Sequence, residues 1–477
     1  MRALFLAALV SLPAAAAAQR TALAPADSAL IGRILLAEDK RDSTDVALAE
    51  GARHADIRVS TIAKRARWRI RDARFAARDS LPPLPAPPSY PEPAWRLRFR
   101  AMTAQKNECG ALRAALSDSA WAVRLRAADL VPATCATDEA LLGTLREWVD
   151  ALPATTSRRA PNGVSWHAGA HGVVALARVR PDEARTRLAK VVAHRQWQVR
   201  AYAARAAGLL SDTVRLRVLT RDPDDNVKEA AIEALAKLTG HLDDALFVMA
   251  LNAPGAQAVR AAAMALKGSP RDDIQRLATA AYTRWAAKGI ASARDARVAL
   301  LEAAGRPATD DRMPTPRGEL LPDAIALALG ADVRLRVTMA PTHGGGSFVV
   351  RLRGDVAPLM ASRILALARA SYYDGLTWHR VEPDFVIQGG SPGASEYVGL
   401  SDFMRDELGT VPHVRGTVGM STRGHDTGDA QWFVNLRDNA RLGRDYTVFA
   451  EVIQGIDVVD GILEGDIVAS ITEIQPR

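Results

Sequence analysis

The chain has 477 residues, of which 48% are hydrophobic, and this size and composition predict two or more globular domains. The net charge of +8 is unevenly distributed. Residues 331–477 carry 14 Arg, no Lys and 19 acidic residues, giving −5, so the rest of the chain carries +13. A basic surface can meet acidic partners, although arginines solvated on helix surfaces explain the same charge. We find no platform of interleaved aromatic and basic residues to support nucleic-acid binding.

The N-terminus has the pattern of a secretory signal. Met1 and Arg2 give a basic start, residues 3–12 are apolar, and residues 14–18 are all Ala. This pattern predicts a signal peptide over residues 1–18, with cleavage after Ala18. A buried first helix is the alternative reading. The apolar run is too short to span a bilayer well, and no later stretch predicts a transmembrane helix. We therefore expect a periplasmic or secreted protein.

Residues 19–304 are rich in Ala, Leu and Arg, in a pattern that predicts short helices. A Val followed by Arg or Lys, with a small or apolar residue four positions after the Val, recurs at Val123, Val199, Val227 and Val259. Residues 171–176 contain a further candidate copy. Residues four apart share one helix face, where small side chains let a neighbouring helix pack closely. The segment resembles HEAT-like repeats, which implies an α-solenoid that binds a client or partner protein, or a scaffold that only spaces the enzyme.

Two proline-rich stretches interrupt the helical pattern. Residues 80–94 contain seven prolines, which favours an extended spacer. Residues 305–330 predict a linker to a C-terminal domain over 331–477. The two cysteines, Cys109 and Cys135, form a disulfide in an exported protein or remain two buried thiols, and their sequence positions do not decide between these alternatives.

Beyond residue 331 the pattern changes to short alternating segments. Residues 333–337 and 347–352 alternate like strands, and residues 357–370 fit one amphipathic helix. Further short strands follow, separated by glycine-rich turns. This order predicts a closed antiparallel β-barrel with capping helices.

Several linked motifs in this region resemble the cyclophilin family of peptidyl-prolyl cis-trans isomerases. They are Trp378-His-Arg-Val-Glu-Pro-Asp-Phe-Val-Ile-Gln-Gly-Gly390, Gly416-Thr-Val-Gly-Met420, Gln431-Trp-Phe-Val-Asn435 and Leu442-Gly-Arg-Asp-Tyr-Thr-Val-Phe449. The resemblance covers roughly residues 333–472 and implies isomerisation of X-Pro bonds, assisting the folding of exported proteins. It implies no cofactor and no metal, and proline-containing polypeptides as the substrates.

The family's chemistry suits these residue types. Rotation about a prolyl bond must cross a barrier of about 18–20 kcal/mol, and no covalent bond is broken. Arg380 supplies a fixed planar cation beside the twisting amide, and the resemblance implies that Gln388 orients it. It also implies a substrate-binding surface made of Phe385, Val386, Met420, Ser421, Thr422, Phe433, Leu442 and Tyr446. Taken without the flanking motifs, the apolar members of this set would be read as core residues.

Three positions depart from the family pattern. Val386 replaces a frequent Met, and Trp432 replaces a Phe that the family packs into its core. Arg441 stands where cyclosporin-sensitive members carry Trp, so tight cyclosporin binding is not expected. His379 is interpreted as a structural residue.

Two other functions have some support in the sequence. Residues 389–393 fit the G-x-S-x-G motif of serine hydrolases, but the residue after Ser391 is Pro392, which has no N–H to donate to an oxyanion. The second is a binding protein or chaperone that grips proline segments with little turnover. The combination of Arg380, Gln388 and Phe433 favours an enzyme.

Overall fold

The computed structural model describes residues 23–71, 84–152, 166–314, 318, 320–342 and 344–475. The predicted signal peptide and the start of the proline-rich stretch lie outside the described residues. Within the described part of the chain, no helix is long and apolar enough to cross a membrane.

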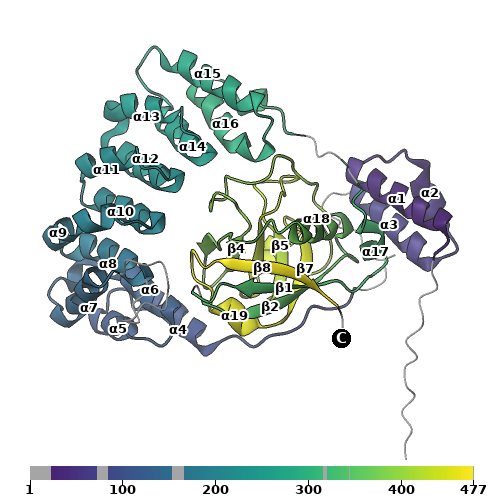
Figure 1. The fold of residues 1–477 in the computed structure, drawn as a ribbon, viewed down its shortest axis with the longest axis horizontal. Coiled ribbons are helices and arrows are strands. Elements are labelled where there is room, and N and C mark those ends of the chain that lie inside the picture. Colours follow the sequence, from purple (N-terminus) through teal and green to yellow (C-terminus); the bar gives the residue numbers. More distant parts are fainter. Residues whose placement is uncertain are drawn as a thin grey trace, which may run out of the picture.

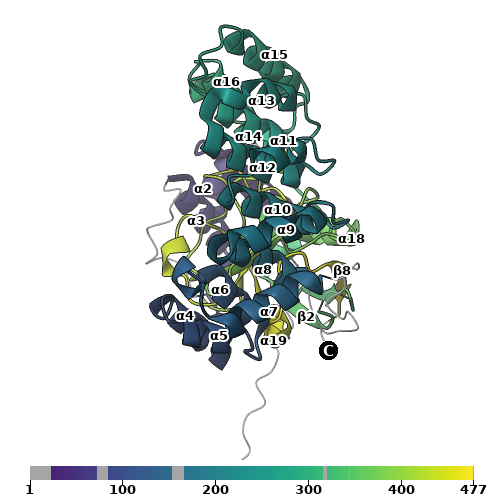
Figure 2. The same cartoon turned by 90° about the vertical axis from the view of Figure 1, so that its left-hand side faces the viewer.

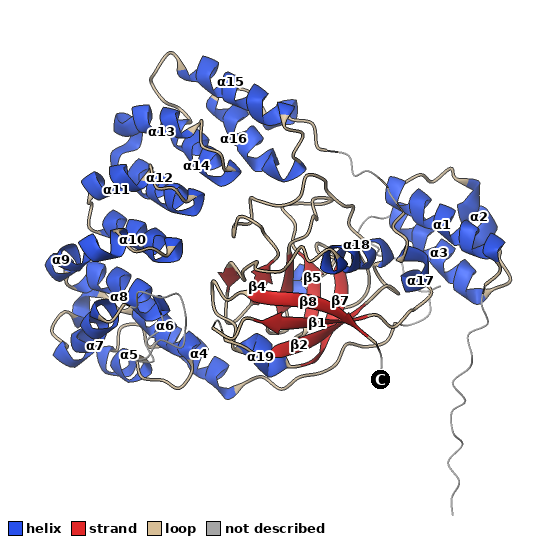
Figure 3. Ribbon diagram, viewed as in Figure 1, coloured by secondary structure: helices blue, strands red, loops and turns tan. Residues whose placement is uncertain are grey.

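The predicted all-helical N-terminal region is confirmed (Figure 3). Three helices come first and form a separate group (Figure 1): α1 (Pro25–Lys40), α2 (Val46–Ala52) and α3 (Ile57–Arg71). The helices that follow, which we call the helical array, are α4 (Ala94–Ala104), α5 (Cys109–Ala115), α6 (Trp121–Leu130), α7 (Glu139–Asp150), α8 (Trp166–Val179), α9 (Pro181–Val192), α10 (Trp197–Leu209), α11 (Thr213–Leu219), α12 (Asp225–Thr239), α13 (Asp244–Ala250), α14 (Ala256–Leu266), α15 (Ile274–Ala287) and α16 (Arg294–Ala303).

The helical array has two layers. The even-numbered helices pack against one another in sequence, α4 on α6, then α8, α10, α12, α14 and α16, and the odd-numbered helices cover them on the outside. Figure 2 shows the stack from α4 at the bottom to α15 at the top. The recurring valines Val123, Val199, Val227 and Val259 all lie on inner helices and are buried. Residues 171–176 lie on α8, which packs between α6 and α10, so the wide gap between Val123 and Val199 contains one further inner helix.

Residues 331–475, which we call the sheet domain, form one antiparallel sheet. Its strands are β1 (Arg334–Met339), β2 (Ser347–Leu352), β3 (Arg380–Val381), β4 (Val386–Gly389), β5 (Thr417–Met420), β6 (Trp432–Asn435), β7 (Val448–Gln454) and β8 (Val468–Ile474). The strand order is β3-β4-β6-β5-β7-β2-β1-β8. Backbone hydrogen bonds join residues 375–378, just before β3, to residues 465–468 at the start of β8.

Helices and one apolar core complete the sheet domain. The predicted helix over 357–370 is α18 (Pro358–Arg369), and α19 (Ile456–Asp460) follows β7. Phe348, Val418, Val434, Phe449 and other buried apolar side chains fill the core. The expected linker over 305–330 is only partly a loop. Its residues 324–328 form α17 (Ala324–Ala328), whose buried Ala324 and Leu327 pack it between α1 and α18.

The N-terminal helices are joined to the sheet domain by a buried charge cluster. Arg69 on α3 is fully buried and donates to the backbone oxygens of Leu408 at 2.8 Å and Val356 at 3.0 Å. Its remaining nitrogen pairs with Glu38 on α1, which also pairs with Arg65 at 3.3 Å. Burial raises the pKa of Glu38, but the charges of Arg65 and Arg69 lower it further, so its carboxylate stays ionised. The cluster is therefore an ionic contact between segments far apart in the sequence.

We expect Arg69→Met to lower the free energy of unfolding by about 3–5 kcal/mol, because it removes one of the two buried cations that pair with Glu38 and takes the buried donor from two backbone oxygens. Arg33 on α1 is half exposed and makes only long ion pairs, so Arg33→Met should cost under about 1 kcal/mol. Urea unfolding of the two variants measures both values. Equal losses would show that the buried cluster contributes no more than a surface pair.

Cys109 and Cys135 form a disulfide, which decides between the two alternatives left open by the sequence. Their Cα atoms lie 5.5 Å apart, and the bond connects the start of α5 to η1 (Ala133–Cys135). It encloses α6 in a loop with a sequence separation of 26. A cross-link of this size stabilises the folded array mainly by restricting the unfolded chain.

Replacing both cysteines, with Cys109→Ser and Cys135→Ser together, should destabilise the array by about 3 kcal/mol. Urea unfolding followed by far-ultraviolet circular dichroism reports on the helices. The wild-type chain treated with a reductant should unfold at the same midpoint as the double variant. An unchanged midpoint in both would contradict a stabilising role.

Candidate active site

The strand register brings the predicted catalytic residues into one row. Arg380 on β3 lies directly opposite Gln388 on β4, and Gln388 lies opposite Phe433 on β6. Phe433 in turn lies opposite Gly419 on β5. Directly paired residues of an antiparallel sheet project from the same face, so the cation, the amide and the aromatic ring share one surface.

A chain of amide side chains supports the cation. Arg380 Nη1 lies 3.5 Å from Gln388 Oε1, and Gln388 Nε2 lies 3.4 Å from Gln431 Oε1. Gln431 Nε2 then donates to the backbone oxygens of Glu396 and Val398, both at 3.1 Å. Gln388 is buried, whereas the Arg380 side chain is 41% exposed and therefore open to a ligand. The fixed amide orients a guanidinium whose charge remains accessible.

Gln431 is a further candidate site residue, which its motif alone did not identify. The signal was its position two residues before Phe433, since alternate residues of a strand project to the same side. In the structure it connects Gln388 to the loop at Glu396.

An apolar cluster, which we call the candidate proline pocket, lies beside the row. Val386, Phe433 and Leu442 are buried and pack together, with Phe385 and Tyr446 half-buried against them. Leu442 ends the short helix η5 (Ala440–Leu442), and the ring of Tyr446 meets Phe433 edge-on at 5.8 Å. The five side chains come from three separated segments and form one cluster. An apolar surface of this kind suits a small apolar ring such as that of proline.

His413 supports the back of this pocket. Its ring stacks on Phe433 at 5.8 Å, and its Nε2 lies 3.0 Å from the backbone oxygen of Tyr446. Asn435 Nδ2 lies 3.2 Å from His413 Nδ1, which assigns the tautomer with the proton on Nε2. Burial lowers the pKa of His413, so the ring stays neutral and both contacts are satisfied.

The placement predicted for Met420 is wrong. Gly419 faces the pocket, because a Cβ added there would lie 2.4 Å from Phe433 Cζ. Met420 follows it along β5 and therefore projects to the opposite face, where it is fully buried in the core of the sheet domain. Ser421 and Thr422 are half-buried beyond the end of β5, and the N–H of Ser421 donates to the oxygen of Gln431. The substrate contacts expected of these two residues stay predictions.

Two positions that depart from the family pattern, Arg441 and Trp432, contact aromatic rings. Arg441 lies over the ring of Phe385 at 4.2 Å, and Arg380 lies 5.9 Å from the same ring. Two guanidinium groups thus lie near the ring of Phe385, at the rim of the pocket. Trp432 is buried in the core, where its ring meets Trp378 at 5.0 Å.

The hydrogen bonds of the Ser391 hydroxyl are not those of a catalytic nucleophile. It donates to the backbone oxygen of Val398 at 2.7 Å and accepts from the N–H groups of Gly393 and Ser395. These bonds hold a turn rather than activate an oxygen. Among the residues that the structure describes, no group of three or more His, Cys, Asp or Glu side chains is placed to hold a metal ion.

His379 precedes Arg380 and is partly buried. Burial lowers the pKa of His379 from 6.5 to about 4, and the neighbouring charge of Arg380 adds to this, while a backbone hydrogen bond with Thr377 opposes it. At neutral pH the ring is uncharged. Arg380 therefore has no second cation beside it at this position.

This lowered pKa predicts a pH-dependent stability. Between pH 6.5 and 4 the unfolded chain binds a proton at His379 and the folded chain does not. The free energy of unfolding therefore falls as the pH falls. The loss should reach about 3 kcal/mol in unfolding free energy. Urea unfolding at several pH values should show a shallower decline for His379→Gln than for the wild-type chain. Parallel curves would contradict a buried neutral imidazole.

Comparisons with known proteins find a matching family model and similar isomerases. The family model described as cyclophilin type peptidyl-prolyl cis-trans isomerase/CLD matches residues 336–474. A peptidyl-prolyl cis-trans isomerase of Helicobacter pylori is 35% identical over 130 residues, covering 26% of this chain and 80% of the relative. Peptidyl-prolyl cis-trans isomerase B of Bacillus subtilis is 32% identical over 129 residues, covering 27% and 90%. A crystal structure of a Cryptosporidium parvum isomerase of the cyclophilin type is 20% identical with a TM-score of 0.28, covering 31% of this chain and 99% of that chain.

Proposed function

Because the chain belongs to the family of cyclophilin-type peptidyl-prolyl cis-trans isomerases, we propose that it isomerises X-Pro bonds in exported polypeptides and so assists their folding. The observation that carries the proposal is the cross-strand row. It holds an accessible Arg380, oriented by Gln388, beside the pocket that contains Phe433.

The mechanism needs no covalent step. The pocket of Val386, Phe433 and Leu442 receives the proline ring and holds it while the preceding peptide unit turns. Turning removes amide resonance and leaves a lone pair on a pyramidal nitrogen. Arg380 donates to this nitrogen, so it stabilises the twisted state more than either planar isomer. Gln388 acts through Arg380 by fixing its direction.

Export is supported by two independent features. The sequence begins with a basic start, an apolar run and an Ala-rich end, as secretory signals do. The disulfide between Cys109 and Cys135 is of a kind that persists in oxidising compartments and is rare in the cytosol. We propose a periplasmic or secreted location, where newly exported chains are the substrates.

The helical region is proposed to bind a client or partner protein. Its resemblance to HEAT-like repeats supports this, because stacked helix pairs create long binding surfaces. The alternative function is an adaptor or chaperone that grips proline segments with little turnover. Turnover of a short peptide separates the two.

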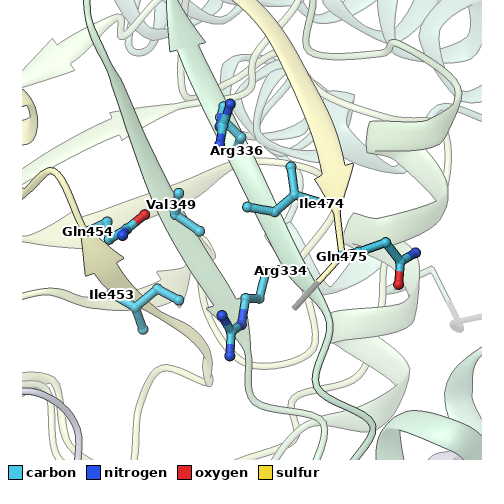
Figure 4. Close-up of a pocket in the computed structure, with 7 residues that line it drawn as sticks. All are labelled: Arg334, Arg336, Val349, Ile453, Gln454, Ile474 and Gln475. Atoms are coloured by element: carbon cyan, nitrogen blue, oxygen red, sulfur yellow. The ribbon is translucent and has the colours of Figure 1, made fainter. Parts of the chain in front are cut away.

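The test is cis-trans exchange of a short X-Pro peptide, measured by NMR exchange spectroscopy with catalytic amounts of the full chain. We expect wild-type protein to accelerate exchange, and Arg380→Ala to reduce the acceleration by about 10²–10³, the usual cost of removing one electrostatic donor. The matched control is Arg334→Ala. Arg334 lines a groove between β1, β2, β7 and β8 (Figure 4), on a strand distant from β3 in the sheet order. The groove has a volume of about 730 Å³.

Each outcome has a definite meaning. Full activity in Arg334→Ala with a collapse in Arg380→Ala establishes the enzyme and its main residue. No acceleration by folded wild-type protein would leave the adaptor function. Unchanged activity in Arg380→Ala would contradict the role given to that arginine.

A further inference from the structure

Two cavities meet at the catalytic arginine, and each has walls from both parts of the chain. One has a volume of about 500 Å³ and lies between α10, α12 and residues 394–397. The other, of about 320 Å³, lies between α4, α6, α8, α10 and residues 379–383. Both volumes are within the range of about 300–1,000 Å³ typical of ligand pockets. The residues that line both cavities are Tyr202, Arg205, His379, Arg380 and Glu464.

Specific contacts fix the distance between the two walls. The Tyr202 hydroxyl on α10 donates to Glu464 Oε2 at 3.0 Å, and His167 Nε2 lies 2.7 Å from the backbone oxygen of Glu464. On the other side, Asn226 Nδ2 at the start of α12 donates to the oxygen of Gly393 at 3.0 Å. The groove between these attachment points is therefore part of the folded structure rather than a space between loosely tethered domains.

The loop at the rim of the larger cavity is bonded to the catalytic row. The backbone oxygen of Glu396 accepts from Gln431, which contacts Gln388. The next residue, Tyr397, has its ring under the guanidinium of Arg260 on α14 at 3.9 Å. One short segment thus contacts both the helical array and the side chains that orient Arg380.

The wall formed by α10 and α12 has a mixed chemistry. Arg205, Glu233 and Lys237 are exposed on it, and Trp197 adds an aromatic ring. Ala230 and Ala234 lie between the charged residues and leave room for a ligand. Aromatic, small and oppositely charged side chains together suit a polypeptide with varied side chains. A phosphate ligand would instead call for a cluster of one sign.

We propose that this groove is a second part of the substrate site, and that the inner face of α10 and α12 holds the polypeptide segment next to the isomerised proline. The inference rests on the proposed function and narrows it. The preferred substrate is an extended, unfolded polypeptide several residues longer on one side of the proline than the pocket itself can contact. A tetrapeptide reaches the catalytic row but not α12.

A spin label tests occupancy of the groove directly. The two native cysteines are joined in a disulfide, so a label attaches only to a newly introduced thiol. Lys237→Cys places it in the groove. Lys190→Cys, on the outer helix α9 (Figure 1), is the control. With a peptide of about twelve residues and one central X-Pro bond, about 40 Å when extended, the label at position 237 should broaden the NMR signals of residues flanking the proline. The label at position 190 should leave them sharp.

Kinetic measurements test whether contact between the long peptide and the groove contributes to catalysis. Glu233→Trp with Lys237→Trp puts two bulky rings on one face of α12, because residues four apart on a helix are neighbours. This pair should lower kcat/KM for the long peptide about tenfold, or 1.4 kcal/mol, and leave that for the tetrapeptide unchanged. Thr186→Trp with Lys190→Trp repeats the same spacing on α9 and should change neither.

The outcomes separate the inference from the proposed function. No broadening by the label in the groove, no change for the long peptide, or an equal loss for both peptides would overturn the inference. If wild-type protein fails to isomerise the tetrapeptide but the label broadens the long peptide, the groove binds polypeptide and the proposed enzymatic function is wrong.

Discussion

The guanidinium of Arg96 on α4 joins the helical array to the segment that carries the apolar pocket. It is fully buried and donates to the oxygens of Pro383 at 2.8 Å and Leu436 at 2.7 Å, and it pairs with Asp460 at 2.9 Å. Pro383 lies two residues before Phe385, whose own oxygen accepts from the N–H of Leu436. A buried cation needs this complete set of partners. The placement of Phe385 and that of the array are therefore fixed together.

Much of the sheet domain could be predicted, because several of its motifs together resemble a known family and the resemblance implies the fold. Arg380 and Gln388 meet because they are eight residues apart in a tight hairpin. Met420 was misplaced because a motif does not say which face of its strand a residue occupies. The recurring valines identified the buried side of the inner helices. Periodicity cannot show where the array lies against the sheet domain, since those contacts join residues hundreds of positions apart.

The uneven charge of the chain now has a structural explanation. Arginines of the basic segments form ion pairs with carboxylates of the acidic sheet domain: Arg41 pairs with Asp426 at 3.9 Å, Arg96 with Asp460 at 2.9 Å and Arg100 with Asp384 at 2.8 Å. The sequence allowed acidic partners or solvated surfaces for this charge. The structure gives several of these arginines partners in the same chain, so the excess of +13 overstates the positive charge that the helical region presents to other molecules.

The contacts of Arg69 also constrain the order in which the chain folds. Its partners Val356 and Leu408 follow it by 287 and 339 residues. A chain that leaves the ribosome or a membrane pore N-terminus first must keep α1–α3 without their final neighbours until most of the sheet domain has emerged. Contacts with such long sequence separation form slowly, because a large loop must close before they contribute stability. The earliest helices to be synthesised are thus among the last to be locked in place.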